Sequence, residues 1–346
     1  MYEQCTMDDV RRALTFVLDY AVRDTWVEIG MAIKAEFGDS AFDIWDEWSQ
    51  QADNYCPRSA KSTWKSFKRS AGGVGIGSLF AKAKEGGYKF ESRELTPGEK
   101  AAWAKEKAAR EKQRAEEVRR EEAEIAAWHE VVRQQAQGIW SELKPTGRSK
   151  YLGSKKIGSH GVRFFRSALL LIERKGHLER VEGQEKISRF FALPKEGRPK
   201  FHYFKSGYFA IPMTDIDGVI WNLQIITPTG KKLFLRNGRK SGLYALLGQM
   251  DSRKPLILVE GFSTGASAHE ATNCPVLICF DCGNLMPVAL LVRQRFPDQH
   301  LVFAADNDLH LEVNDGVEKA NAAARAVGGS SVWIPSLREE MEEVAA

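Results

Sequence analysis

Three carboxylates follow two apolar runs in the last third of the sequence. Glu260 comes directly after Leu256–Val259, and Asp306 and Asp308 come directly after Leu301–Ala305. Carboxylates two residues apart point to one side of an extended segment, and Mg²⁺ is held by one or two carboxylates together with substrate phosphates. The sequence therefore predicts a shared Mg²⁺ site for phosphoryl transfer, with Mn²⁺ as an alternative ion.

Strand and helix patterns alternate around these acids. Apolar runs typical of buried strands occur at 255–259, 275–280, 300–304 and 331–334, and runs typical of helices at 263–271, 285–295 and 315–327. Such alternation predicts a parallel sheet covered on both faces, with ligands at the carboxyl ends of its strands. Gly261 follows Glu260 and precedes a helix start, where a phosphate can approach closely.

A basic stretch precedes this region. Residues 144–205 contain 16 Lys and Arg against 5 Asp and Glu, interleaved with aromatic residues. This composition is typical of a surface that follows phosphates and stacks bases, and Lys150 and Arg163 are candidate contacts. An ordinary solvated surface over an aromatic core explains it equally well. Residues 208–236 alternate as an antiparallel meander does, with turns at 215–218 and 228–230.

The first part of the chain has a helical pattern. Residues 7–90 carry apolar side chains at helical spacing and four tryptophans, which predicts a small domain with an aromatic core. Thr96-Pro97-Gly98-Glu99 is a helix-start signature, and the helical composition continues to about Leu143. Eight basic and eight acidic residues between Glu99 and Glu124 predict a long solvated helix that serves as a spacer.

Composition excludes several classes of protein. Hydrophobic residues make up 43% of the chain and charged residues 28%, as in folded globular proteins. No apolar run approaches the roughly 20 residues that cross a bilayer, so we expect a protein of the bacterial or phage-infected host cytoplasm without a membrane partner. Five cysteines without a framework spacing fit a reducing compartment, and no zinc is expected at Cys279 and Cys282.

Several blocks resemble the Toprim domain of phage and plasmid primases. These are Val259 to Gly265, Phe280 to Leu285, and Ala304 to Asp308. Upstream, the blocks from Ile211 to Phe234 and from Gly238 to Gly242 resemble the basic subdomain that precedes Toprim in those enzymes. The resemblance covers roughly residues 145–335.

The resemblance implies roles for individual residues. Glu260 would be a metal ligand or general acid/base, and Asp306 and Asp308 would be Mg²⁺ ligands. A further set would contact nucleotide or DNA: Lys231, Lys232, Arg236, Arg239, Lys240, Gly261, Asn284, Lys150 and Arg163. An ordinary basic hairpin is the alternative for the cations among them.

The N-terminal segment resembles a second family, the helical accessory domain PriCT. The blocks concerned run from Asp24 to Ala32, from Trp45 to Ser49 and from Thr63 to Phe67, ending in Ile76 to Leu79. We therefore expect a multidomain α plus α/β protein. Its parts would be a PriCT-like helical domain (1–92), a charged helical linker (93–144), a mixed α+β basic subdomain (145–250), a Rossmann-like parallel Toprim domain (251–336) and an acidic tail (337–346).

Together the two resemblances imply a DNA primase. It would synthesise short RNA primers on single-stranded DNA from nucleoside triphosphates, with the replicative helicase on a separate chain because no GxxxxGK[ST] motif occurs. A Toprim nuclease and a DNA-binding replication adaptor are the alternatives. The acidic cluster that usually follows the last Toprim strand has no match at Pro335 to Met341, which places full metal occupancy in question.

Overall fold

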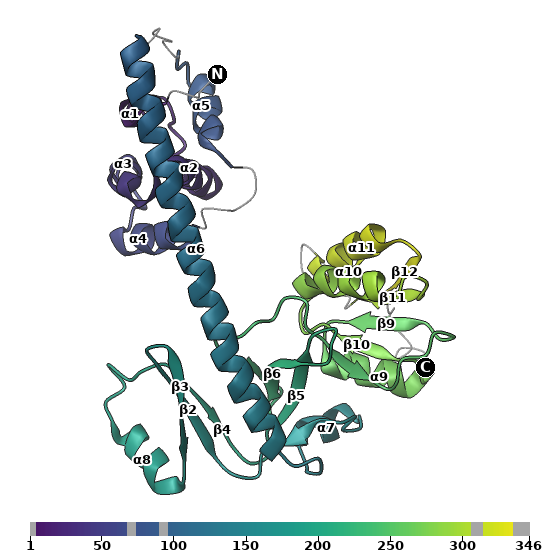
Figure 1. Ribbon diagram of the computed structural model, residues 1–346. Helices are drawn as coiled ribbons and strands as arrows, with labels where there is room; N and C mark the ends of the chain where they lie inside the picture. Colours follow the sequence, from purple (N-terminus) through teal and green to yellow (C-terminus); the bar gives the residue numbers. More distant parts are fainter. Residues whose placement is uncertain (1–4, 68–73, 90–95, 306–313, 335–346) are drawn as a thin grey trace, which may run out of the picture. The chain divides into compact units, whose positions relative to one another are not determined.

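The computed structural model describes residues 5–67, 74–89, 96–305 and 314–334, and the chain divides into two compact units (Figure 1). The units are Met1–Glu121 and Glu122–Ala346. Helix α6 (Pro97–Glu142) contributes residues to both. Its start and end agree with the helix predicted from Thr96 to about Leu143.

The first unit is helical around an aromatic core, as predicted. Trp45 is fully buried, and its ring centroid lies 4.5 Å from that of Trp26 and 5.3 Å from that of Trp64. Gly30 packs so closely that an added Cβ would lie 2.8 Å from the Trp45 ring. The elements before α6 are α1 (Met7–Leu14), α2 (Arg23–Phe37), η1 (Gly38–Ala41), α3 (Phe42–Ser49), α4 (Pro57–Ser66) and α5 (Ile76–Glu85).

The second unit contains a five-stranded sheet in the order β12-β11-β9-β10-β8. The strands β9 to β12 are parallel, and β8 is antiparallel to β10. The bounds are β8 (Ala245–Leu247), β9 (Leu256–Val259), β10 (Val276–Ile278), β11 (Leu301–Ala304) and β12 (Ser330–Trp333). The predicted strands therefore form, but β8 was not predicted, and it precedes the domain boundary that we expected at residue 250.

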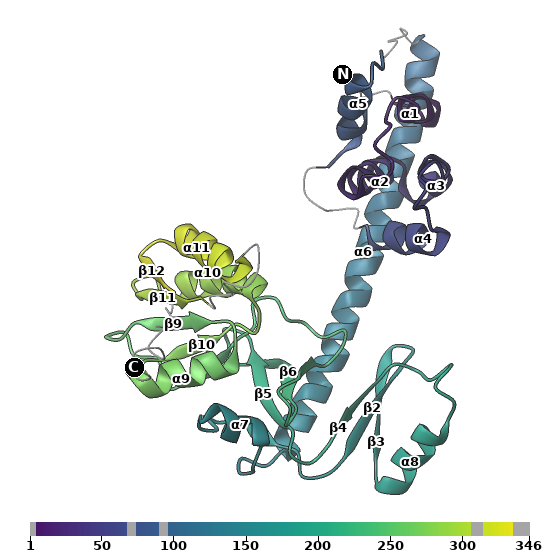
Figure 2. The same cartoon turned by 180° about the vertical axis from the view of Figure 1, so that it is seen from behind.

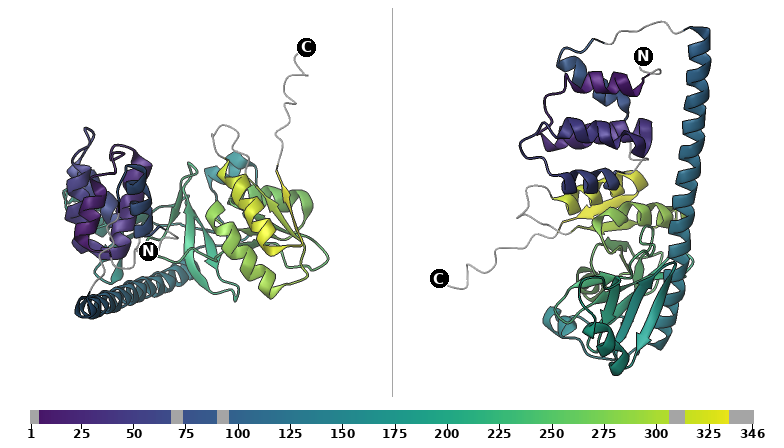
Figure 3. Two further views of the ribbon diagram at one scale, coloured as in Figure 1. Left: turned by 90° about the horizontal axis from the view of Figure 1, so that it is seen from above. Right: turned by 90° about the vertical axis from the view of Figure 1, so that its left-hand side faces the viewer.

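Helices cover both faces of this sheet (Figures 1 and 2). On one face Phe262 and Ala266 of α9 (Phe262–Thr272) pack against Val259 and Ile278. The other face is covered by α10 (Leu285–Arg295), which follows η2 (Cys282–Asn284), and by α11 (Asp315–Val327), side by side in Figure 3. The alternation of buried side chains along β9 explains this arrangement, because neighbouring residues of a strand face opposite sides.

Two antiparallel sheets complete the second unit. One has the order β1-β5-β6-β7 and contains the predicted meander, and the other has the order β3-β2-β4. Their strands are β1 (Arg163–Phe164), β2 (Leu169–Arg174), β3 (His177–Glu182), β4 (Phe201–Phe204), β5 (Phe209–Thr214), β6 (Ile220–Ile226) and β7 (Lys232–Phe234). The short helices are α7 (Lys150–Lys155) and α8 (Gln184–Ala192), and α8 covers the three-stranded sheet.

The end of α6 belongs to the core of the second unit. Val132, Ala136 and Ile139 are buried at helical spacing against residues of both antiparallel sheets. The Gln137 side chain donates a hydrogen bond to the Ile220 carbonyl over 3.1 Å. The expectation of a solvated spacer is therefore wrong for this part of the helix, where the apolar face packs instead. Within the described residues, no helix is long and apolar enough to span a membrane.

Candidate functional site at the carboxyl edge of the parallel sheet

Three parallel strands end side by side at the centre of the five-stranded sheet. Val259 of β9 pairs with Ile278 of β10 and with Ala304 of β11. The Cys279 N–H continues the ladder by donating to the Val259 carbonyl over 2.8 Å. Residues that follow these strands therefore leave the sheet at one common edge, where parallel α/β sheets usually bind ligands.

Glu260 leaves this edge from the central strand. Its half-buried side chain directly precedes Gly261, the N-cap residue of α9. A Cβ on Gly261 would lie 3.4 Å from the Lys232 ammonium nitrogen. The Lys232 ammonium therefore lies beside the start of the helix that directly follows the predicted catalytic acid.

Asp306 and Asp308 lie outside the described residues. The last described residue before them is Ala305, whose N–H donates to the Trp333 carbonyl over 3.0 Å. Their predicted position beside Glu260 therefore remains a prediction. Among the side chains that the structure describes, no group of three His, Cys, Asp or Glu residues could hold a metal ion.

A basic hairpin reaches the same edge. The Phe234 ring of β7 lies 6.3 Å from the Phe280 ring at a near-perpendicular angle of 85°. Phe280 follows β10 with φ of 73°, a left-handed conformation that is strained for an aromatic residue. The Lys240 ammonium lies 4.7 Å from the Phe234 ring centroid. The structure thus brings Lys232 and Lys240 to the edge where Glu260 lies, while Lys231 is exposed in the preceding turn.

The two arginines of this hairpin face other elements. The Arg239 guanidinium lies 5.2 Å from the Trp221 ring centroid. Arg236 lies 3.7 Å from the Glu173 carboxylate, and its backbone N–H donates to His202 Nε2 over 3.0 Å. Burial and the Arg236 charge lower the pKa of His202 to about 4, so this imidazole is a neutral acceptor at neutral pH. Both arginine side chains therefore interact within the protein.

Asn284 is buried, and its side chain hydrogen-bonds to backbone groups of two segments of the chain. Its buried amide donates to the carbonyls of Leu243 and Cys279, each over 2.8 Å, and its Oδ1 accepts from the Gly242 N–H over 2.7 Å. Gly242 has φ of 72°, which glycine adopts without strain. Asn284 thus joins the loop after the basic hairpin to the end of β10, and its contact with nucleic acid stays a prediction.

Arg163 contacts the end of α6, and Lys150 lies at the start of α7, so neither was described at the sheet edge. Arg163 donates to the Trp140 carbonyl over 2.7 Å, and its guanidinium lies 4.6 Å from the Trp140 ring centroid. It therefore fastens β1 to the end of α6. Lys150 is exposed at the start of α7.

Asp281 is a further acid near this edge, and the sequence analysis did not name it as a candidate metal ligand. It is exposed three residues after Ile278, the last residue of β10. The signal was the same as for Glu260, an acid that follows a buried apolar run. Nearby, burial raises the pKa of the Cys279 thiol, and Cys282 Sγ accepts a hydrogen bond from Lys319 over 3.3 Å.

Comparisons with known proteins identify the helical unit. Residues 10–83 match the family model of Primase C terminal 2 (PriCT-2). This range contains the aromatic core built on Trp45 and covers the blocks on which the PriCT resemblance was based. That part of the expectation is confirmed.

Two curated proteins from Escherichia coli, both called DNA primase TraC, are similar to the chain. One is 30% identical over 253 residues, 71% of this chain and 20% of TraC. The other is 38% identical over 130 residues, 36% of this chain and 9% of that protein. The chain therefore spans at most about a fifth of the length of these relatives.

Among solved structures, the DnaG primase catalytic domain bound to ssDNA is 13% identical. The match covers 60% of this chain and 74% of the DnaG domain, with a TM-score of 0.37, which is too low to establish a common fold. The chain is therefore similar in sequence to DNA primase TraC, and its residues 10–83 are similar to the PriCT-2 family, as the two resemblances implied.

Proposed function

We propose that this chain is a DNA primase that synthesises short RNA primers on single-stranded DNA. The reacting centre would be a Toprim site at the carboxyl edge of the parallel sheet. The observation that carries the proposal is the register of β9, β10 and β11, whose paired ends Val259, Ile278 and Ala304 direct the following residues to one edge. Similarity to DNA primase TraC supports the choice of reaction.

The acidic residues after these strands offer the type of ligand atom that a magnesium ion prefers. Glu260 and Asp281 offer carboxylate oxygens, and Asp306 and Asp308 follow β11 in the sequence. Oxygen ligands are those that Mg²⁺ prefers, and no soft ligand is needed. Glu260, Asp306 and Asp308 would hold it. Bound there, magnesium would activate the attacking 3′-hydroxyl and stabilise charge on the transferred phosphate.

The protein's own cations would bind the triphosphate. Lys232 lies beside Gly261, and the Lys240 ammonium lies over the Phe234 ring, so both exposed lysines lie close to this edge. Cations beside a phosphoryl group stabilise the charge that develops on it. Lys231 would contribute to attraction of the template by charge alone.

The test is primer synthesis in vitro on the whole chain. Labelled ribonucleotides, Mg²⁺ and single-stranded DNA are incubated with the parent, with Glu260→Gln and with Asp306→Asn, and products are separated by length. Asp298→Asn is the matched control, because this exposed acid lies in the turn between α10 and β11. Loss of a catalytic carboxylate is expected to lower the rate roughly a hundredfold or more.

Each outcome assigns a function. Short products from the parent and the control, but not from the two site variants, support the primase and its site together. Degraded template without products identifies a nuclease at the same acids. DNA binding without either reaction identifies a replication adaptor, and then a helicase on a separate chain becomes the partner to seek by co-purification.

A further inference from the structure

Phe280 has a strained backbone at the point where the central strands of the parallel sheet end. Its φ of 73° lies in the left-handed region, which glycine adopts freely and an aromatic residue does not. The residue follows Cys279, whose N–H extends the ladder between β10 and β9, and it precedes Asp281. Residues other than glycine keep this conformation only where the surrounding structure holds them, and they are concentrated at functional sites.

Hydrogen bonds hold the backbone on both sides of Phe280. The Cys279 carbonyl accepts from the Asn284 side-chain amide over 2.8 Å, and the Asp281 carbonyl accepts from the Asn284 N–H over 3.2 Å. Both bonds come from one residue, so they fix the turn that the chain makes at Phe280. Glycine would form the same turn without strain. The backbone alone therefore does not explain a phenylalanine here, and its side chain contributes something that glycine lacks.

The Phe280 ring connects the parallel sheet to the basic hairpin, which comprises residues 231–242. The ring is 6% exposed and packs in one hydrophobic cluster with Ile278 of β10. The Phe234 ring meets it edge to face, and the Lys240 ammonium lies over the other ring, 4.7 Å from the Phe234 centroid. Both kinds of contact are attractive. A continuous line of contacts therefore joins the end of β10 to an exposed lysine of the basic hairpin.

We propose that Phe280 is a positioning residue, whose ring holds the basic hairpin at the carboxyl edge of the parallel sheet. The left-handed backbone turns the chain after β10, and the ring contacts Phe234 from this turn. Lys232 and Lys240 are thereby kept near the edge at which Glu260 leaves the sheet. The consequence for catalysis rests on the proposed function, in which these lysines bind the triphosphate, whereas the contact between the rings does not.

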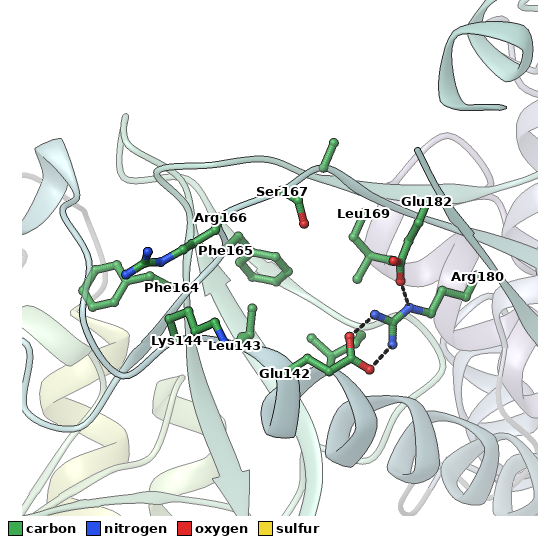
Figure 4. Close-up of a pocket in the computed structure, with 12 residues that line it drawn as sticks. Glu142, Leu143, Lys144, Phe164, Phe165, Arg166, Ser167, Leu169, Arg180 and Glu182 are labelled. Carbon is green, nitrogen blue, oxygen red and sulfur yellow. Dashed lines mark hydrogen bonds and ion pairs between the residues drawn. The ribbon is translucent and has the colours of Figure 1, made fainter. Parts of the chain in front are cut away.

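Two measurements on the whole chain test this role. Hydrogen exchange resolved by peptide reports how firmly the basic hairpin is held, and steady-state primer synthesis separates KM for the nucleoside triphosphate from kcat. The variants are Phe280→Leu, which keeps an apolar side chain without the ring, and Phe280→Gly, which also relieves the backbone. Phe164→Leu is the matched control. Phe164 is buried in the same hydrophobic cluster, but its ring packs against Phe209, and it borders the pocket at the end of α6 (Figure 4).

A positioning role predicts roughly tenfold faster exchange in the basic hairpin and a KM roughly tenfold higher in both Phe280 variants, with kcat within about twofold of the parent. Phe164→Leu should lower the free energy of unfolding without either effect. Unchanged exchange in the basic hairpin of both Phe280 variants, or equal acceleration in Phe164→Leu, overturns the proposal, because the ring then serves only the core. Faster exchange with an unchanged KM likewise overturns a positioning role. If the parent makes no primers, the proposed function fails, and hydrogen exchange still decides whether Phe280 holds the basic hairpin.

Discussion

Replacement of Asn284 by alanine tests whether this residue acts through structure or through contact with DNA. The side chain makes three hydrogen bonds, to the backbone of Gly242, Leu243 and Cys279, and is 4% exposed. Alanine leaves one N–H donor and two carbonyl acceptors without this partner in the interior. The substitution therefore acts on the connection between the loop and the end of β10.

The magnitude follows from the number of bonds. A buried hydrogen bond contributes about 1 kcal/mol net, so the loss of three predicts about 3 kcal/mol of destabilisation of the second unit. Asn284→Asp keeps an acceptor for the Gly242 N–H but turns carboxylate oxygen toward two carbonyls. We therefore expect Asn284→Asp to be no more stable than Asn284→Ala.

Hydrogen exchange resolved by peptide in increasing urea measures this loss for the second unit alone. Asn321→Ala is the matched control, because Asn321 is partly exposed and donates one hydrogen bond within α11, to the Val317 carbonyl. It should cost about 1 kcal/mol or less. A loss below about 0.5 kcal/mol for Asn284→Ala, accompanied by weaker DNA binding, would refute the structural role and support the predicted contact with nucleic acid.

Three further predictions concern other parts of the chain. Lys232→Ala removes the ammonium beside Gly261 and should weaken triphosphate binding roughly tenfold while the melting temperature stays unchanged. A lower melting temperature in a thermal scan would show instead that Lys232 stabilises the fold. The pKa of His202 is lowered from 6.5 to about 4 in the fold, so the unfolded chain takes up the proton first. Stability should therefore fall by up to about 3 kcal/mol as pH drops from 6.5 to 4, a decline in urea titrations that His202→Gln should reduce. Gly30→Ala forces a methyl group against two aromatic rings and should destabilise the helical unit by about 1–3 kcal/mol, whereas Gly77→Ala on α5 meets open space and should show no such loss in hydrogen exchange.

Local patterns in the sequence were sufficient for most elements of the second unit. Strand β9 is a run of four apolar residues, and α9, α10 and α11 follow their strands at the predicted places. Periodicity indicates which side chains are buried, and apolar runs that alternate with helical segments indicate parallel strands. The position of Glu260 at the end of β9 follows from this pattern alone.

Contacts between residues that are distant in the sequence could not be predicted from local patterns. The Asn284 amide meets Gly242 and Leu243 across about forty positions, and Arg163 meets Trp140 across 23. The antiparallel pairing of β8 with β10 and the burial of Ile139 at the end of a charged helix are also long-range. The sequence around Asn284 and Arg163 carries no signal of these contacts, because a polar residue has the same local composition whether it faces solvent or a backbone carbonyl. The helical spacing of Val132, Ala136 and Ile139 was such a signal, which the high charge of the helix obscured.

The sequence by itself determined which residues could do chemistry, and tertiary structure decided which of them are available for it. Residue type and strand position are local properties, so the strand that precedes Glu260 and the antiparallel meander were predicted correctly, while the chemical roles of these residues stay predictions. Availability depends on what else fills the space around a side chain. Packing directed Arg239 toward Trp221 and Arg236 toward Glu173, and left Lys232 beside Gly261. That selection arises from the meeting of separate sheets, which no local pattern encodes.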